Sequence, residues 1–381
     1  MATITGTPGN DTLSGTAGND QISALGGNDV IFGSGGSDKL DGGDGSDTVN
    51  YSRLTSVEVD LGGNWAMKDS GTDTLVSIGN AVGTGGRDTL WGNANVNLLQ
   101  AGAGDDLLIG GAGNDTLDGG PGSDRVAYFT SPNGVTVDLA AGTASDGFGT
   151  TDRIISVGLA DGSDHADTLS GTADVNVLSG GGGDDRLFGR DGNDTLIGGQ
   201  GNDLLDGGNG SDTVSYLHDP GGVTVDLAAG TATDGWGNHD TIVSCGLVIG
   251  TPESADVLMG NDNANTIQGF GHGDVLTGRG GADTFVSSSL DWWGSTVTDF
   301  QHGLDKLLVD LGSLPVSHTP GPLDPAFFTT GTPTGSHWSF TYTQSTGTVA
   351  FDSDGSGPNG ANTVMTLGNH PTLSAADIMI A

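Results

Sequence analysis

Residues 101–127 read AGAGDDLLIGGAGNDTLDGGPGSDRVA, which is three consecutive copies of one nine-residue pattern. Across the copies, glycine recurs at positions one, two and four, aspartate at position six and an aliphatic residue at position eight. The same register runs through residues 6–50, 83–127, 162–215 and 251–286, which gives twenty units. Aspartate fills position six in seventeen of them and asparagine in three, Asn97, Asn176 and Asn265. A period of nine therefore organises nearly half of the chain.

Each position of the unit has a physical role. Glycine permits the positive φ that a tight turn needs and that a β-carbon opposes. An aspartate at position six offers hard carboxylate oxygens, the ligands that Ca²⁺ takes, and turn carbonyls can complete its shell. Positions seven to nine form a very short strand in which residue eight faces away from its two neighbours. We expect stacking of such strands to bury a ladder of Leu, Ile and Val side chains.

Composition excludes several classes of protein. The 381 residues include 72 glycines and one cysteine, Cys245, so a disulfide framework and a Cys-rich zinc site are excluded. There is no apolar run of about 18 residues, so we expect no membrane span. Ten Lys and Arg residues against 48 Asp and Glu residues give a formal charge of −38. The basic residues are scattered singly, so nucleic acid is not an expected partner.

The pattern G-G-x-G-x-D-x-U-x, repeated in twenty units, resembles the RTX (repeats-in-toxin) family of calcium-binding nonapeptide repeats. This resemblance implies an all-β fold, a right-handed parallel β-roll or β-helix solenoid with a C-terminal β-rich capping domain. It also implies two nonads per turn, with Ca²⁺ between the turns of nonads n and n+2. About a dozen ions would then bind, and they would leave a net charge near −14.

The expected metal ligands are the seventeen position-six aspartates. They are Asp11, Asp20, Asp29, Asp38, Asp47, Asp88, Asp106, Asp115, Asp124, Asp167, Asp185, Asp194, Asp203, Asp212, Asp256, Asp274 and Asp283. In the alternative interpretation, these aspartates only cap glycine-rich turns through side-chain hydrogen bonds. Stacked carboxylates without a cation would repel one another strongly, which favours the metal.

The repeats divide the chain into eight segments. We expect repeat blocks at 1–50, 83–127, 162–215 and 251–286, and spacer coils at 51–82, 128–161 and 216–250. Residues 287–381 form the expected cap and secretion signal. The spacers are similar to one another and show strand-like alternation, so we expect wider coils that continue the roll.

The spacers contain the aspartate pairs Asp69–Asp73, Asp146–Asp152 and Asp234–Asp240. These pairs could hold further ions, but solvated turn aspartates are the favoured interpretation. Cys245 aligns with aliphatic residues of the other spacers, so we expect a small buried side chain.

The tail resembles the C-terminal region of serralysin-type proteases and other type I-secreted RTX exoproteins. The resemblance implies a cap that carries an uncleaved secretion signal and ends in a short apolar run, here 377–381. A plain last strand is the alternative. The start, MATITGTPGNDTL, lacks the basic and apolar regions of a signal peptide. We therefore expect the Gram-negative type I secretion apparatus as a partner and an extracellular location.

No catalytic constellation stands out. H-E-x-x-H, G-x-S-x-G and P-loop motifs are all missing, so we predict no catalytic residue and no organic cofactor. Because the repeats begin at residue 6, the expected function is a non-enzymatic matrix, adhesion or surface-layer component. Extracellular polysaccharide, a cell surface and self-association are the partners that this leaves open.

The alternative function is a β-helical polysaccharide-acting enzyme or its carbohydrate-binding accessory module. Trp65, Trp236, Trp292 and Trp293 are candidate sugar-stacking residues, although core or capping aromatics are the favoured interpretation.

The composition also predicts a folding switch. Low hydrophobicity with high like charge is typical of a disordered chain. We expect the chain to stay unfolded where Ca²⁺ is scarce and to fold where Ca²⁺ supplies the free energy.

Overall fold

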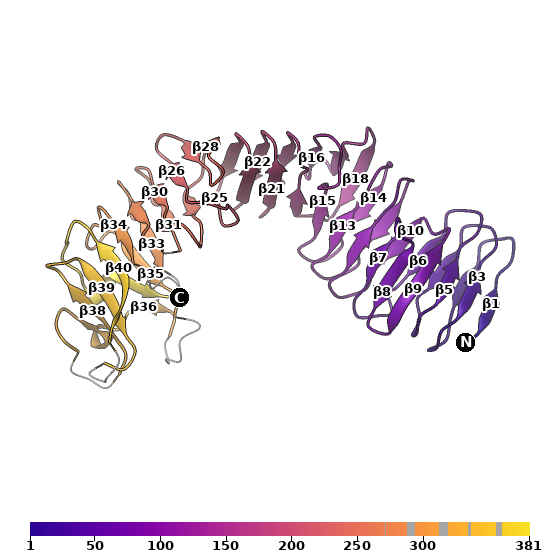
Figure 1. Cartoon of the computed structure of the whole chain (residues 1–381), viewed down its shortest axis with the longest axis horizontal. Helices are drawn as coiled ribbons and strands as arrows, with labels where there is room; N and C mark the ends of the chain where they lie inside the picture. Colours follow the sequence, from indigo (N-terminus) through magenta and orange to yellow (C-terminus); the bar gives the residue numbers. More distant parts are fainter. Residues whose placement is uncertain (271, 288–293, 312–318, 334–336, 356–359) are drawn as a thin grey trace. The chain divides into compact units, whose positions relative to one another are not determined.

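The computed structural model describes residues 1–381 except 271, 288–293, 312–318, 334–336 and 356–359. The chain divides into two compact units, Met1–Gly192 and Asn193–Ala381. Short β-strands make up almost all of the regular structure (Figure 1). The described residues add two 3-10 helices, η1 (Pro325–Phe327) and η2 (Ala375–Asp377). They contain no helix long and apolar enough to cross a bilayer.

In the first unit, successive nonads contribute strands alternately to two sheets. Strands two nonads apart pair in parallel, so that Ile4 lies beside Ile22, and Leu13 beside Ile31. This offset of eighteen residues means two nonads per turn, as expected for a parallel β-roll.

The strands follow in their order of pairing. The first sheet contains β1 (Thr3–Thr5), β3 (Gln21–Ser23), β5 (Lys39–Asp41), β9 (Gly71–Val76), β8 (Trp65–Lys68), β7 (Glu58–Asp60), β11 (Thr89–Trp91), β13 (Leu107–Ile109), β15 (Arg125–Ala127), β19 (Leu159–Asp161) and β21 (Val177–Gly182). The second contains β2 (Thr12–Ser14), β4 (Val30–Phe32), β6 (Thr48–Asn50), β10 (Asn80–Val82), β12 (Leu98–Gln100), β14 (Thr116–Asp118), β18 (Thr151–Ile155), β17 (Thr143–Ser145), β16 (Thr136–Asp138), β20 (Thr168–Ser170) and β22 (Arg186–Asp191).

The second unit has the same two-sheet construction. Its first sheet contains β23 (Thr195–Gln200), β25 (Thr213–Ser215), β29 (Leu247–Ile249), β31 (Thr266–Gln268), β33 (Thr284–Ser287), β35 (Lys306–Val309), β41 (Ile378–Ile380) and β36 (Gly321–Pro322). The second sheet contains β24 (Leu204–Asn209), β28 (His239–Val243), β27 (Thr231–Thr233), β26 (Thr224–Asp226), β30 (Val257–Met259), β32 (Val275–Thr277), β34 (Ser295–Val297), β40 (Asn362–Leu367), β39 (Thr348–Asp352), β38 (Ser339–Thr343) and β37 (Phe328–Thr329).

The three spacers contain antiparallel inserts, which the sequence did not predict. We name them the first insert (57–78), the second insert (135–157) and the third insert (223–245). Each is a three-stranded antiparallel segment, β7–β8–β9, β16–β17–β18 and β26–β27–β28. The outer strands stay in parallel register with neighbouring nonads, and only the middle strand runs the other way. The roll therefore continues through every insert.

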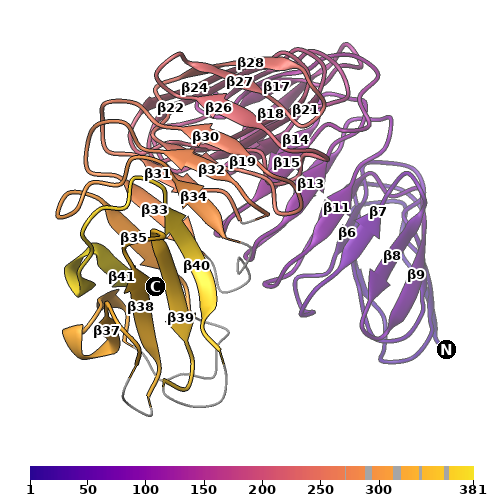
Figure 2. The same ribbon diagram turned by 60° about the vertical axis from the view of Figure 1, so that its left-hand side comes forward.

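The tail extends the second unit's roll before it caps it. β34 and β35 add rungs to the two sheets, and the last strand, β41, pairs in parallel with β35. β38, β39 and β40 form an antiparallel meander beside them (Figure 2). The 377–381 segment thus includes a last strand of the roll, in which Ile378 and Ile380 are buried.

The core is the predicted ladder at position eight. Ile31, Leu40, Leu99, Leu117 and Leu205 are fully buried, and each lies beside a similar side chain one turn away. Burying each such side chain contributes about 1.5–3 kcal/mol. Each sheet contributes one such row, Ile4–Ile22–Leu40 in the first and Leu13–Ile31–Val49 in the second. The turns at the edges consist mainly of glycine, aspartate and other polar residues.

Candidate calcium sites

The position-six aspartates form stacked ladders along the edges of the sheets. Each lies immediately before a strand, and most are almost completely buried. The Oδ1 atom of Asp29 accepts the backbone N–H of Asp11 at 2.7 Å, and Oδ1 of Asp47 accepts that of Asp29 at 2.9 Å. Stacking therefore brings like charges to successive turns of the roll.

All seventeen predicted aspartates belong to such ladders. Within the units they group as Asp11–Asp29–Asp47, Asp20–Asp38, Asp88–Asp106–Asp124, Asp115, Asp167–Asp185, Asp194–Asp212, Asp203, Asp256–Asp274 and Asp283.

The inserts continue these ladders with aspartates that the repeat pattern does not include. Oδ1 of Asp73, Asp152 and Asp240 accepts the N–H of Asp38, Asp115 and Asp203, respectively. In each case Oδ2 accepts a buried tyrosine hydroxyl, from Tyr51, Tyr128 and Tyr216 at 2.9, 3.1 and 3.0 Å. Asp305 of the tail plays the same ladder role below Asp283.

Burial overturns the favoured interpretation of the insert aspartates. Asp73, Asp146, Asp152, Asp234 and Asp240 are at most 2% exposed and accept hydrogen bonds from the surrounding turns. They are therefore not solvated turn residues. Asp69 is the exposed exception.

One class of turn satisfies its own carboxylate. In five units position two is Ser or Thr, and in a sixth Thr251 stands at position one; in all six the hydroxyl donates to the position-six carboxylate. In the unit of Asp20, for example, the Thr16 hydroxyl and backbone N–H both reach Oδ2, at 2.7 and 2.6 Å. The six capped aspartates are Asp11, Asp20, Asp38, Asp88, Asp167 and Asp256. Turn capping, the alternative interpretation, therefore occurs in these six units.

A second class leaves one carboxylate oxygen buried without a hydrogen bond from any described residue. In these open turns the position-two residue has a positive φ, as at Gly43 (+92°), Gly111 (+84°) and Arg279 (+68°). Seven aspartates clearly belong to this class, namely Asp29, Asp47, Asp106, Asp115, Asp124, Asp212 and Asp283. A buried polar atom without a partner is costly, so each of these oxygens is a candidate ligand for a cation.

Backbone carbonyls surround the open turns. A β-carbon on Gly43 would lie 2.1 Å from the Leu25 carbonyl oxygen, and one on Gly122 would lie 1.6 Å from that of Gly104. The carbonyls at positions two and four therefore face the turn two nonads later. At Gly43 and Gly122 a side chain would therefore clash with the stacked turn.

The three asparagine units form a third class. The amide Nδ2 of Asn97 donates to the Gly79 carbonyl at 2.6 Å, and Asn265 donates to Gly246 at 3.2 Å. Asn176 makes the same contact with Gly158 at 3.0 Å. Each glycine lies where the chain leaves an insert, so an amide donor satisfies the carbonyl there.

Desolvation raises the pKa of several ladder carboxyls. Burial is the first cause for Asp115, with Asp152 and Asp146 as nearby negative charges, and its pKa rises to about 7. Burial likewise raises the pKa of Asp88, Asp124 and Asp283 to about 6. The protein alone therefore does not compensate these charges.

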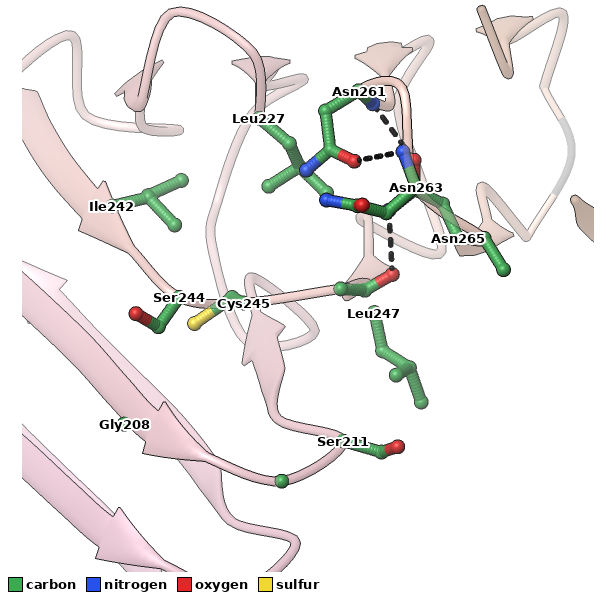
Figure 3. Close-up of a pocket in the computed structure, with 13 residues that line it drawn as sticks. Gly208, Ser211, Leu227, Ile242, Ser244, Cys245, Leu247, Asn261, Asn263 and Asn265 are labelled. Carbon is green, nitrogen blue, oxygen red and sulfur yellow. Dashed lines mark hydrogen bonds between the residues drawn. The ribbon is translucent and has the colours of Figure 1, made fainter. Parts of the chain in front are cut away.

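The cavity in Figure 3 belongs to the second unit and has a volume of about 480 Å³. Leu227, Ile242 and Cys245 line it beside an asparagine turn, and none of its lining residues is a carboxylate. Cys245 is 6% exposed, and burial raises its pKa to about 12. The prediction of a small buried side chain is thus confirmed.

The tryptophan predictions have mixed outcomes. Trp236 is 41% exposed, so it is neither a core nor a capping residue. Trp65 is half-buried on β8. Trp292 and Trp293 lie outside the described residues.

The model of the RTX calcium-binding nonapeptide repeat matches residues 5–40, 14–49, 80–96, 91–126, 161–196, 179–214 and 253–285. These segments coincide with the four blocks of turns described above. The chain is an RTX repeat protein. RTX repeats bind Ca²⁺, and proteins that carry them are typically exported by the type I pathway.

A solved structure adds one similarity. The extracellular lipase LipA from Serratia marcescens is 15% identical, with a match over 100% of this chain and 40% of that chain and a TM-score of 0.19. The RTX chain therefore spans less than half of that protein. The search of curated proteins found no match to the present chain. The fold assignment depends on the strand register and the repeat model.

Ca²⁺ fits the open turns of this RTX protein by the chemistry of the donors. Each open turn combines a buried carboxylate oxygen with carbonyls from neighbouring turns, an all-oxygen set that suits Ca²⁺. The first insert shows that a cation is accommodated at a ladder, because Nζ of Lys68 contacts Oδ1 of Asp73 and, at 2.6 Å, the Gly36 carbonyl. Among the described residues, no three His, Cys, Asp or Glu side chains form a metal-holding group.

Proposed function

We propose that this RTX protein is a secreted β-roll that folds when Ca²⁺ binds between its open turns. The supporting observation is the row of buried carboxylate oxygens without hydrogen bonds in the open turns. Without a cation, stacked and desolvated carboxylates oppose folding, and with Ca²⁺ they become ligands. Binding free energy then becomes folding free energy, because only the folded chain has the sites.

We further propose that the three classes of turn have different roles in Ca²⁺ binding. Open turns supply carboxylate ligands, and their position-two and position-four carbonyls complete the shell. The capped turns hold their carboxylates with Ser or Thr and do not depend on the ion. Asparagine turns join each insert to the next block without metal.

The experiment compares open and capped turns by replacing position-six aspartates with asparagine, the residue that Asn97 provides at this position in its own unit. One variant carries Asp106→Asn, Asp115→Asn, Asp124→Asn and Asp212→Asn. The matched control carries the same change at the capped Asp20, Asp38, Asp88 and Asp167. Far-UV circular dichroism follows folding as Ca²⁺ is added to metal-free protein, and native mass spectrometry counts bound ions.

We expect the metal-free wild type to lack the β spectrum and to gain it with Ca²⁺. The open-turn variant should bind fewer ions and need at least tenfold more Ca²⁺ to fold. The capped-turn control should keep the wild-type ion number. A metal-free protein that is already fully folded would refute the folding switch, and equal ion loss in both variants would refute the division into classes.

We propose a matrix, adhesion or surface-layer role for the folded protein. Its ladders continue from turn to turn and present a repetitive edge, which suits binding to a repetitive polymer or to another copy. The test adds Ca²⁺-loaded protein to cells and to exopolysaccharide. Retention without release of reducing sugar supports the role, whereas release of reducing sugar or unsaturated uronate would support the enzyme instead.

Carbohydrate binding has one specific observation in its favour. Trp236 and Phe148 occupy equivalent positions in the third and second inserts, and each is 41% exposed. Both follow a buried aspartate, whose Oδ1 accepts their backbone N–H at 3.0 Å. A fixed aromatic ring at the surface is a suitable platform for a sugar face. Loss of polysaccharide retention in Trp236→Ala would support this mode.

A further inference from the structure

The three inserts differ in one buried residue. Ala66, Ala144 and Ala232 occupy the same register, opposite Asp73, Asp152 and Asp240 of the next strand. Two residues later the first insert has Lys68, whereas the second has Asp146 and the third has Asp234. At this equivalent buried position, the first insert therefore has a lysine where the other two inserts have an aspartate.

The contacts of Lys68 show that this buried position accommodates a positive charge. The lysine is 7% exposed, and its Nζ contacts the Gly36 carbonyl oxygen and Oδ1 of Asp73. The Asp73 Oδ1 atom also accepts the N–H of Asp38 at 2.9 Å, so the ammonium lies within a carboxylate ladder. A positive charge therefore occupies this position in the first insert.

The second insert has the same surroundings with the opposite charge. Asp146 and Asp152 are 0% and 1% exposed, and Gly113 takes the place of Gly36. The loop that carries Asp146 is docked on this turn, because Thr150 Oγ1 accepts the Gly113 N–H at 3.1 Å. Asp115, whose Oδ2 has no hydrogen bond from any described residue, is close enough to Asp146 and Asp152 for their charges to raise its pKa.

The third insert repeats the arrangement. Asp234 and Asp240 are each 2% exposed, and the insert docks on its neighbouring turn through the His239 N–H, which donates to Oδ1 of Asn202 at 3.0 Å. The same contact joins Thr151 to Asn114 in the second insert, at 3.1 Å. Two independent copies therefore place an extra buried carboxylate where Lys68 places an ammonium.

We propose that the second and third inserts each bind one further Ca²⁺ ion in the position of the Lys68 ammonium group. The donors are the carboxylate of Asp146 or Asp234, Oδ1 of Asp152 or Asp240, and the carbonyl oxygen of Gly113 or Gly201. This inference rests on the proposed function, because both require the chain to bind Ca²⁺.

Length and charge both support this assignment. An aspartate side chain ends two bonds earlier than lysine, and the gap is about one calcium–oxygen bond of 2.3–2.6 Å. Exchanging Lys for Asp changes the local charge by two, which a divalent ion restores. Asp146 and Asp234 accept hydrogen bonds from their own loops, which offset part of the cost of burial. A cation would also offset the repulsion between each of them and the neighbouring carboxylate.

The test exchanges the residues between inserts in the full-length chain. The double variant Asp146→Lys/Asp234→Lys gives the second and third inserts the lysine of the first, and Lys68→Asp gives the first insert the aspartate of the others. Asp69→Lys is the matched control, since Asp69 is an exposed neighbour of Lys68. Native mass spectrometry at saturating Ca²⁺ counts the ions, and circular dichroism confirms folding.

We expect the double variant to bind two ions fewer than the wild type, Lys68→Asp to bind one more, and Asp69→Lys to bind the same number. If the double variant does not fold, the Lys68→Asp variant tests the inference alone. An unchanged number of bound ions in that variant would overturn it. Unchanged counts in both variants, with many ions on the wild type, would overturn only the insert sites. A wild type that binds no Ca²⁺ would overturn the proposed function itself.

Discussion

The metal-free chain should be more stable at pH 5 than at pH 8. Burial raises the pKa of Asp88, Asp124 and Asp152 from 3.8 to about 6, and that of Asp115 to about 7. Between pH 4 and these values the folded state binds more protons than the unfolded state. The free energy of unfolding therefore falls as pH rises through this window, and the loss is complete at about pH 8, one unit above the highest of these pKa values.

The size of the effect follows from these four carboxyls of the first unit. A pKa shift of one unit corresponds to about 1.4 kcal/mol, so each carboxyl costs on the order of 3 kcal/mol once it ionises. Together they cost on the order of 10 kcal/mol, which is comparable to the entire net stability of a typical domain, about 5–15 kcal/mol. Each Ca²⁺ at about 100 times its Kd returns about 2.7 kcal/mol, so a few sites offset the loss.

Far-UV circular dichroism of metal-stripped protein between pH 8 and pH 5 measures this dependence, because a chain that is unfolded at pH 8 should gain β signal as these carboxyls are protonated. Ca²⁺-loaded protein should show little change over the same range. Asp115→Asn removes the carboxyl with the highest pKa and should flatten the metal-free profile, whereas Asp11→Asn, in a half-buried capped turn, should leave it as it is. Equal metal-free stability at both pH values, or greater stability at pH 8, would refute the reasoning.

Two further predictions concern buried groups. Tyr128→Phe and Tyr216→Phe each remove a hydrogen bond to a buried carboxylate and should cost about 1–3 kcal/mol in the Ca²⁺-loaded protein. Tyr51→Phe should cost less, because Lys68 also contacts the carboxylate, and equal losses in calorimetry would contradict this. Cys245 should react with iodoacetamide at pH 8 at least 100-fold more slowly with Ca²⁺ than without it, and equal rates would show that burial does not protect it.

The repeat pattern was enough to predict the parallel roll. A residue such as Leu99 faces the core because of its place in a nine-residue unit, and the pairing of strands eighteen residues apart follows from two units per turn. The antiparallel inserts could not be predicted in the same way. Their middle strands, β8, β17 and β27, are three or four residues long and lie outside the period, so only their pairing reveals them.

The division of the aspartates was visible in the sequence at position two but was not predicted. Thr16 and Gly43 both occupy position two of units whose sixth residue is aspartate. Only the structure shows that the turn of Thr16 is capped and that of Gly43 is open. No pattern in the sequence indicates the role of Lys68, because that role depends on contact with a buried carboxylate on another strand. Long-range contacts of this kind are what the period of nine cannot encode.

The last strand is buried in the folded second unit. Asp377 is fully buried, and its carboxylate accepts hydrogen bonds from the Gly303 N–H, 2.9 Å away, and the Ser374 hydroxyl, 2.8 Å away. Ile378 and Ile380 of β41 are buried beside β35. If the segment 373–381 is the secretion signal, it is accessible only while the second unit is unfolded. The same desolvated carboxylates that destabilise the metal-free roll would then keep this segment exposed until Ca²⁺ is met.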